Sequence, residues 1–119
     1  MSTSKYLSES IFNLLISNTL TCIAKLNVGY WNNVKAGDVI TFTDGKREVN
    51  VLVDSLSFFN NFGDAWFTHG ENLIPSSISN IVTAGDAIRY YRQQYTHEDT
   101  IACGVVVLTI HVQGDVHTL

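Results

Sequence analysis

The amino-acid sequence predicts an α+β fold with helices and a small β-barrel. The predicted elements follow the order helix, strand, two hairpin strands, two helices and a last strand, which is typical of this class. An Asp44-Gly45 pair separates the two hairpin strands, and this dipeptide is the strongest short-range hairpin signal. The segment 104–112 is almost continuously apolar, which favours a strand near the centre of the sheet.

Length and composition indicate one folded domain over residues 1–119. With 45% hydrophobic and 15% charged residues, the chain lies far from the composition of disordered proteins. The longest apolar run, 104–112, is shorter than the about 20 residues that a membrane span needs. Glu9 interrupts any secretion-signal pattern near the N-terminus. We therefore expect a cytoplasmic or nuclear protein without membrane association.

Charge and cysteine usage narrow the classes of partner. The net charge of −4 argues against strong non-specific nucleic-acid binding, because that affinity comes mostly from neutralised phosphates. Cys22 and Cys103 lie in strand-like segments without metal-ligand spacing, so we expect buried reduced thiols. His111 and His117 flank Asp115 in an aperiodic tail, and no further ligand is spaced to join them. The sequence predicts no metal site and no cofactor.

The N-terminal part is expected to be a helix followed by a strand. Apolar residues recur at helical spacing between 4 and 17, and Asn18 is a plausible stop. The segment 18–27, NTLTCIAKLN, alternates and predicts a half-buried strand. One face carries Leu20, Cys22, Ala24 and Leu26, and the other carries Thr19, Thr21, Ile23, Lys25 and Asn27. The second face is either a solvated sheet surface or the wall of a cleft.

The remaining elements follow from turn signals and periodicity. In the loop over 28–37, Tyr30 and Trp31 are too bulky for a plain solvent turn, so we expect them to cover a barrel end. The strands of the hairpin span 38–43 and 47–58. After them we expect a short helix over 64–69 ended by Gly70, a turn over 72–77, a helix over 84–95 capped by Thr83, a strand over 104–112 and an aperiodic tail.

Several short stretches together resemble one family. They are Trp31, Lys35-Ala36-Gly37-Asp38, Val39-Ile40-Thr41-Phe42, Ser57-Phe58, Gly70, Leu73-Ile74-Pro75, Tyr90-Tyr91-Arg92, Tyr95 and Gly104-Val105-Val106-Val107. Over almost the whole chain this series resembles the ASCH-domain proteins, a branch of the PUA-like superfamily. The resemblance implies a mixed β-barrel with a cleft beside the strand after the first helix. Members are proposed to bind RNA or modified nucleosides, and a few hydrolyse an acylated cytidine or cleave single-stranded RNA.

The family pattern places a lysine, a threonine, a glutamate and an arginine along the strand 18–27. In this chain Leu20 stands at the lysine position, Thr21 is kept, Ile23 stands at the glutamate position and Lys25 at the arginine position. Leu20 and Ile23 supply neither a base nor a group that stabilises an oxyanion. The resemblance therefore implies a binding module for RNA or a nucleotide-like ligand, without the family's hydrolytic activity.

The candidate site residues come partly from this pattern and partly from side-chain chemistry. Lys25 is either a solvated strand lysine or a cleft cation, and Tyr30 can stack on a base whereas Trp31 is better explained by packing. Arg89 and Arg92 are candidates for secondary phosphate contacts. The candidate cleft residues are Thr21, Ile23, Lys25, Tyr30, Trp31 and His69.

Two alternatives stay open. The first is a divergent hydrolase of a modified nucleoside or single-stranded RNA, in which Thr21 and Lys25 act with Asp64, Glu71 or His69. The second is a protein-interaction domain that presents the aromatic surface over 58–67 to a protein partner.

Overall fold

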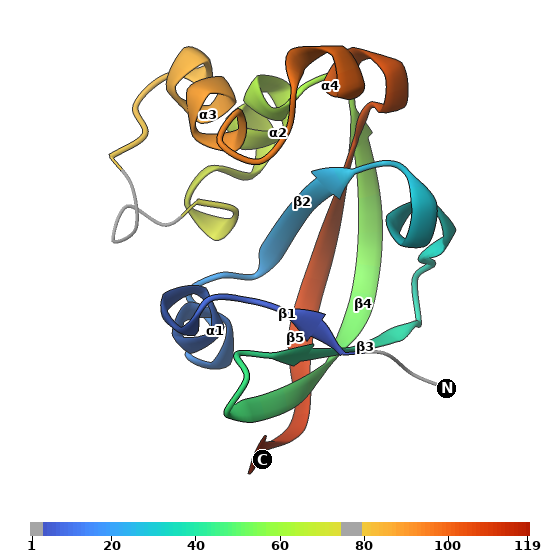
Figure 1. The fold of residues 1–119 in the computed structure, drawn as a ribbon, viewed down its shortest axis with the longest axis vertical. Helices are drawn as coiled ribbons and strands as arrows, with labels where there is room; N and C mark the ends of the chain where they lie inside the picture. Colours follow the sequence, from blue (N-terminus) through green and yellow to red (C-terminus); the bar gives the residue numbers. More distant parts are fainter. Residues whose placement is uncertain (1–3, 75–79) are drawn as a thin grey trace.

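A computed structural model describes residues 4–74 and 80–119, which form an α+β domain around one mixed five-stranded sheet (Figure 1). The hydrogen-bonded order of its strands is β1-β3-β4-β5-β2. β1 pairs with β3 in parallel, and the other neighbours pair antiparallel. The strands are β1 (Lys5–Tyr6), β2 (Cys22–Leu26), β3 (Val39–Thr43), β4 (Arg47–Phe59) and β5 (Val105–Thr118).

Within the described residues the sheet is not closed, so the expected barrel is not confirmed. β1 and β2 form the two edges of the sheet. β1 is only two residues long, because the chain turns at Ser8 into the first helix. A strand of this length cannot pair along the whole edge of β2, and a seam is left between the two edges.

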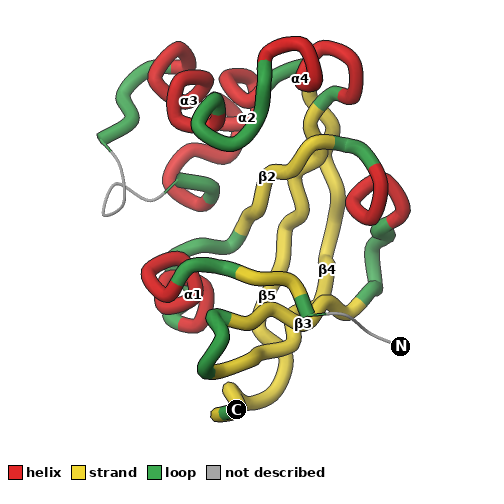
Figure 2. Tube along the Cα trace, in the orientation of Figure 1, coloured by secondary structure: helices red, strands yellow, loops and turns green. Residues whose placement is uncertain are grey.

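The antiparallel pair of β4 and β5 is the longest feature of the fold (Figure 2). Its register runs from Arg47 opposite Thr118 to Phe59 opposite Val105, with two irregularities. The expectation of an aperiodic tail after residue 112 is therefore wrong. From residue 113 to 118 both faces of β5 are exposed, and this exposure removes the alternation by which a strand is recognised in a sequence.

The first helix is shorter than predicted. α1 spans Glu9–Ile16, and the hydroxyl of Ser8 accepts a hydrogen bond from the Ile11 N–H. The segment before it pairs with β3 instead of continuing the helix. Asn18 ends this region as expected, with a φ of 61° in the left-handed region.

β2 is buried on both faces, so the prediction of a half-buried strand is wrong. Ile23 packs into a first core beneath α1, together with Phe12, Leu15 and Phe42. Residues on the other face of β2 pack into a second core beneath the helices of the C-terminal half; they are Cys22, Ala24 and Leu26. The alternation in the sequence separates two cores rather than a core and solvent.

The second core is closed by helices and stacked rings. α2 (Phe62–His69) is capped by Asn61 and ends at Gly70, where φ is 51°. The Phe62 ring stacks on Tyr91 at 4.1 Å between centroids and on Tyr95 at 5.3 Å. Stacking of this kind adds about 0.5–1.5 kcal/mol to the burial of the rings.

In the C-terminal half, two helices differ from the prediction, and part of a predicted turn lies outside the described residues. α3 (Ala84–Tyr91) begins with the predicted Thr83 cap but ends four residues before Tyr95. A further helix, α4 (His97–Cys103), was not predicted, because seven mostly polar residues carry no apolar stripe. Cys103 thus ends a helix instead of lying in a strand. Of the predicted turn over 72–77, residues 75–77 lie outside the described part of the chain.

Two short 3₁₀ helices complete the fold. η1 (Gly29–Asn33) replaces the predicted loop, and η2 (Gly70–Asn72) follows α2.

The predicted hairpin is confirmed and is tied to α1. A hydrogen bond from the Arg47 side chain lowers the pKa of Asp44 to about 2, and Gly45 adopts a φ of 96° in the turn. The same guanidinium donates to Asn13 at 2.8 Å and lies 4.7 Å from the Phe12 ring centroid. The turn is thereby joined to the helix that covers the first core.

The packing of α2 on α3 predicts the effect of a single methyl group. A Cβ added at Gly63 would lie 3.0 Å from Ile88 Cδ1 and 3.1 Å from the carbonyl oxygen of Ala84. Because backbone cannot rotate aside, Gly63→Ala should lower the free energy of unfolding by about 1–3 kcal/mol. Urea denaturation measures this change.

Gly85 provides the matched control, since it also stands second in an eight-residue helix. A Cβ there would meet no atom closer than 3.7 Å, so Gly85→Ala should raise stability by about 0.5–1 kcal/mol. Equal stability of the Gly63→Ala variant and the wild type would contradict close packing of α2 on α3.

Candidate functional site

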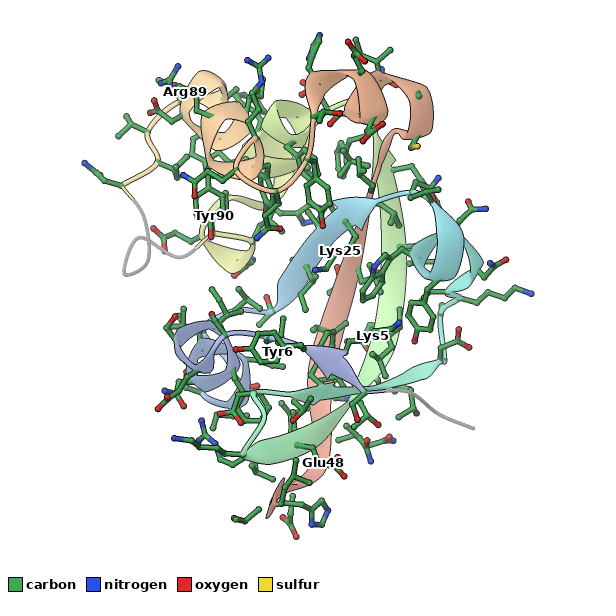
Figure 3. The ribbon with its side chains drawn as sticks, viewed as in Figure 1. Lys5, Tyr6, Lys25, Glu48, Arg89 and Tyr90 are labelled. Carbon is green, nitrogen blue, oxygen red and sulfur yellow. The ribbon has the colours of Figure 1, made fainter. Side chains whose placement is uncertain are left out.

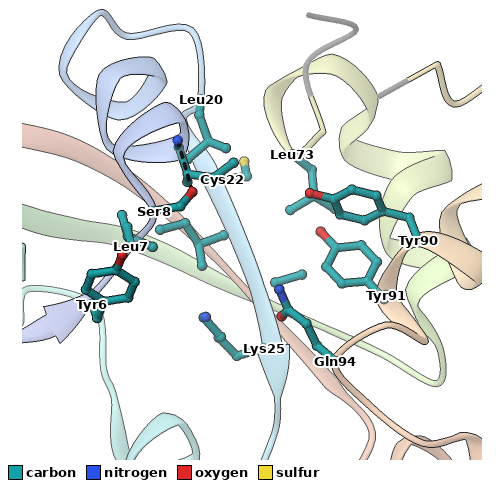
Figure 4. A pocket seen from close by; sticks show the side chains of 13 residues that line it. Tyr6, Leu7, Ser8, Leu20, Cys22, Lys25, Leu73, Tyr90, Tyr91 and Gln94 are labelled. Atoms are coloured by element: carbon teal, nitrogen blue, oxygen red, sulfur yellow. Dashed lines mark hydrogen bonds between the residues drawn. The ribbon is translucent and has the colours of Figure 1, made fainter. Parts of the chain in front are cut away.

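A cavity of about 290 Å³ lies at the seam between the two edges of the sheet (Figure 4). Residues 22–25 of β2 form one wall, and the end of β1 with the start of α1 forms the opposite wall. Tyr90, Tyr91 and Gln94 close the side toward α3, and Leu73 closes the side toward η2. The two edges of the sheet, β1 and β2, are therefore separated by a cleft instead of being paired.

Lys25 is the cation of this cleft. Its side chain is largely buried, and burial lowers the pKa of its ammonium from the usual lysine value. None of the three salt bridges among the described residues includes Lys25. Its Nζ lies 5.3 Å from the ring centroid of Trp31, a weak cation–π contact. A ligand anion at this point would neutralise a charge that no described carboxylate pairs with.

Neutral hydrogen-bonding groups from α3 and the residues after it line the same cavity as Lys25. The hydroxyls of Tyr90 and Tyr91 and the amide of Gln94 point into the cavity (Figure 4). Burial raises the pKa of both phenols, and for Tyr91 its neighbours Tyr90, Tyr95 and Cys22 raise it further. These hydroxyls therefore stay protonated near neutral pH and can both donate and accept.

A row of cations and rings leads away from the cavity along β1 and η1. Figure 3 shows its two lysines, Lys5 on β1 and Lys25 on β2. Lys5 Nζ lies 4.0 Å from the Tyr30 ring centroid, and the Tyr30 and Trp31 rings meet edge to face at 5.0 Å. Tyr30 is 44% exposed, whereas Trp31 is partly buried against the first core. Lys25 joins this row to the cleft.

The structure brings together some of the predicted cleft residues and separates others. Ile23 and Lys25 line the cavity, and Trp31 contacts Lys25 from the side. Thr21 does not line it; its backbone N–H donates to the Asn72 carbonyl at 3.1 Å as the strand begins. The cleft role expected for Thr21 therefore finds no support in the geometry.

His69 is also absent from the described lining of the cavity. It lies at the end of α2, where its Nδ1 is 3.7 Å from the Cys22 Sγ and its ring meets Phe59 edge to face. Cys22 also contacts the Thr109 hydroxyl at 3.7 Å. The imidazole is thus packed beside the second core, and its Nε2 is buried without a hydrogen-bond partner among the described residues.

The two arginines of α3 and its cap are not placed at the cleft. Arg89 is paired with Asp86 on the surface. Arg92 lies 3.5 Å from His97 and lines a separate cavity of about 110 Å³. Secondary phosphate contacts of these residues would lie outside the cleft that Tyr90 and Tyr91 line.

Sequence reasoning missed most of the polar groups in the cleft. Tyr6 and Ser8 lie within the segment predicted to be a helix, so the sequence gives no reason to place them at a cleft. For Cys22 the sequence predicts only a buried core thiol. Tyr90 and Tyr91 belong to the family-like stretch, but only the position of α3 relative to β2 shows that they line the same cavity as Lys25.

The aromatic surface over 58–67 that was expected for a protein partner is only partly exposed. Phe58 is 64% exposed and Phe67 81% exposed, whereas Phe62 between them in sequence is buried in the second core. Single exposed rings such as those of Phe58 and Phe67 occur on many protein surfaces and do not by themselves indicate a protein partner.

Among residues 4–74 and 80–119, no three His, Cys, Asp or Glu side chains form a group that could hold a metal ion. His111 is instead paired with Asp54 at 2.8 Å, and His117 and Asp115 lie on β5. In the same part of the chain no helix has the length and apolar character needed to cross a membrane.

Comparison with known proteins reveals similarity of fold. No family model matches the chain, and no curated protein matches it. The crystal structure of a hypothetical protein, PH0355, has a TM-score of 0.81 at 24% identity and covers 95% of this chain and 100% of its own. The solution NMR structure of protein PF0455 from Pyrococcus furiosus has a TM-score of 0.76 at 26% identity, with coverage of 97% and 100%. The same α+β architecture thus extends over almost the whole chain.

The burial of Lys25 predicts that this residue lowers stability. Lys25→Met keeps the length of the apolar stem and removes the desolvated charge, so the free energy of unfolding should rise by about 1 kcal/mol at pH 7. Because the folded-state pKa lies below the unfolded one, wild-type stability increases as pH rises between these two values, and the difference between the proteins should narrow. Urea denaturation from pH 7 to 10 measures both effects.

Lys46→Met is the control, since Lys46 is exposed in the hairpin turn and should change stability by less than about 0.5 kcal/mol. A Lys25→Met variant that loses more than about 1 kcal/mol would mean that Lys25 holds the cleft together through Trp31.

Proposed function

We propose that this protein is an ASCH-like module that binds RNA or a nucleotide-like ligand, one nucleotide unit at a time, at the seam between β1 and β2. The observation that carries the proposal is Lys25: a largely buried ammonium without a described carboxylate partner, in a cavity that tyrosine hydroxyls line. In this proposal the seam is the mouth of a PUA-like barrel that β1 and β2 leave unsealed.

The size of the cavity supports a ligand of one nucleotide unit. Small-molecule sites range from about 300 to 1,000 Å³, so a cavity of about 290 Å³ is at the lower end. The wall residues are mostly apolar, with a few hydrogen-bonding groups between them, which suits a base with a polar edge. An extended ligand would have to continue outside the cavity, over the exposed Tyr30 ring.

The charge distribution supports a short anionic segment. Lys25 can bind a phosphate as a point charge, and Lys5 is the next cation along the row of rings. The chain as a whole carries a net charge of −4. A long phosphate backbone would therefore meet repulsion away from this row.

The lining favours binding over hydrolysis. The polar side chains of its described residues are hydroxyls, a thiol, an amide and an ammonium, and neither a carboxylate nor an imidazole is among them. A carboxylate or an imidazole is the general base in most hydrolases, so in this cavity Lys25, whose pKa burial lowers, would have to take that role. Two residues on which the hydrolase alternative depends, Thr21 and His69, are not among the described residues that line the cavity.

The proposal predicts that a nucleoside monophosphate binds through Lys25. Titration of AMP and CMP at low salt should shift backbone amide signals of residues 22–25, and Lys25→Ala should weaken the affinity at least about tenfold because the phosphate loses its cation. Isothermal titration calorimetry gives the affinities and NMR gives the site.

Lys46→Ala is the matched control, because it removes one exposed cation that does not line the cavity and should leave the affinity unchanged. If Lys25→Ala and Lys46→Ala bind as tightly as the wild type, the cleft is not the nucleotide site. Appearance of free base or of free phosphate during the titration would instead support a hydrolase.

The lowered pKa of Lys25 predicts an unusual pH dependence of binding. Above pH 7.5 a phosphate monoester is already fully charged, since its second pKa is about 6. The affinity for AMP should then fall as Lys25 loses its proton, at a pH below the usual lysine value of 10.5. Calorimetry from pH 7.5 to 9.5 should show this decrease in the wild type and a flat profile in Lys25→Ala; parallel profiles would contradict the role of Lys25.

A further inference from the structure

β2 faces the cavity with its edge. Four consecutive residues, Cys22 to Lys25, line the cavity, although neighbouring side chains of a strand point to opposite faces. Such a run can line one cavity when the cavity lies beside the free edge of the strand, in the plane of the sheet. The groups that a strand presents in this direction are its backbone N–H and C=O.

The hydrogen bonds of β2 show which of its backbone groups face the cavity. The Thr21 carbonyl accepts from the Ile110 N–H at 2.9 Å, and the Asn27 N–H donates to the Gly104 carbonyl at 3.0 Å. In an antiparallel pair every second residue bonds to the partner strand, so the odd-numbered residues of β2 bond to β5. The N–H and C=O of Ala24 therefore point away from β5, toward the cavity.

Ala24 is buried, and its two backbone groups have no hydrogen-bond partner among the described residues. Its exposed fraction is 5%. More than nine in ten buried backbone groups in native proteins are paired, with other protein groups or with water. A donor and an acceptor side by side at the wall of a cavity can therefore be paired by a ligand that supplies the complementary groups.

We propose that the Ala24 backbone N–H and C=O bind the Watson–Crick edge of a nucleobase, as an added strand would bind them. This inference rests on the proposed function. Every nucleobase carries a hydrogen-bond acceptor beside a donor on that edge, and proteins that bind unpaired RNA bases commonly read it. Lys25 follows Ala24 in the same strand, so one nucleotide can contact the backbone with its base and the ammonium with its phosphate.

The first arm of the test changes the ligand. The affinities of AMP, CMP, GMP and UMP for the wild-type protein are measured by calorimetry, and the tightest ligand is compared with its edge analogue: 1-deaza-AMP, 3-deaza-CMP, 1-methyl-GMP or 3-methyl-UMP. Each analogue lacks one hydrogen-bonding group of the edge. The affinity should fall at least about tenfold, as expected for an unpaired buried group.

The second arm changes the protein at one atom. An α-hydroxy acid at position 24 replaces the peptide N–H by an ester oxygen and should weaken binding of the tightest monophosphate about tenfold. The matched control is the same replacement at position 26. The Leu26 N–H also points away from β5, but Leu26 does not line the cavity, so its ester should bind like the wild type.

The outcomes separate this inference from the function on which it rests. If the monophosphates bind with dependence on Lys25 but the edge analogue and the ester at 24 bind equally well, the role of Ala24 is overturned and the nucleotide cleft stands. If no monophosphate binds, the proposed function is overturned and the role of Ala24 with it. A tenfold loss in both arms, with an unchanged ester at 26, supports the inference.

Discussion

The pairing of β2 with β5 is the interaction on which the rest of the structure depends. This pairing places Ile23 in the core under α1 and Ala24 in the core under α2 and α3. β5 also contributes alternate residues to both cores, so the cores share this strand pair and neither can shift without moving the other. The same pairing satisfies one edge of β2 and leaves the opposite edge to the cavity, so the strand that joins the cores is also the wall of the cleft.

A site built on such a strand is rigid and reduces stability. Its backbone is held by hydrogen bonds on one side and by packing on both faces, which positions Lys25 and Ala24 accurately. The same burial leaves an ammonium partly desolvated and backbone groups without a described partner. Groups of this kind raise the free energy of the folded protein, and a ligand that pairs with them recovers part of it.

Local signals in the sequence predicted the parts of the fold whose stability is local. The Asp44-Gly45 turn requires a positive φ that glycine adopts, and the Thr83 cap closes a capping box with Asp86, so both could be recognised without tertiary contacts. α4 and the last residues of β5 could not be recognised. Each is exposed over most of its length and is held by neighbours distant in the sequence.

By itself, the sequence determined the α+β class, the hairpin, most of the helices and the presence of Lys25 among apolar residues. Only the tertiary structure decided that the strand 22–26 is buried on both faces, that His69 packs against Cys22, and that Tyr90 and Tyr91 line the same cavity as Lys25. The physical reason is that local patterns record turn geometry and one-sided burial. A cleft walled by β1, β2 and the residues of α3 depends instead on segments that are not adjacent in the chain and meet only when both cores are packed.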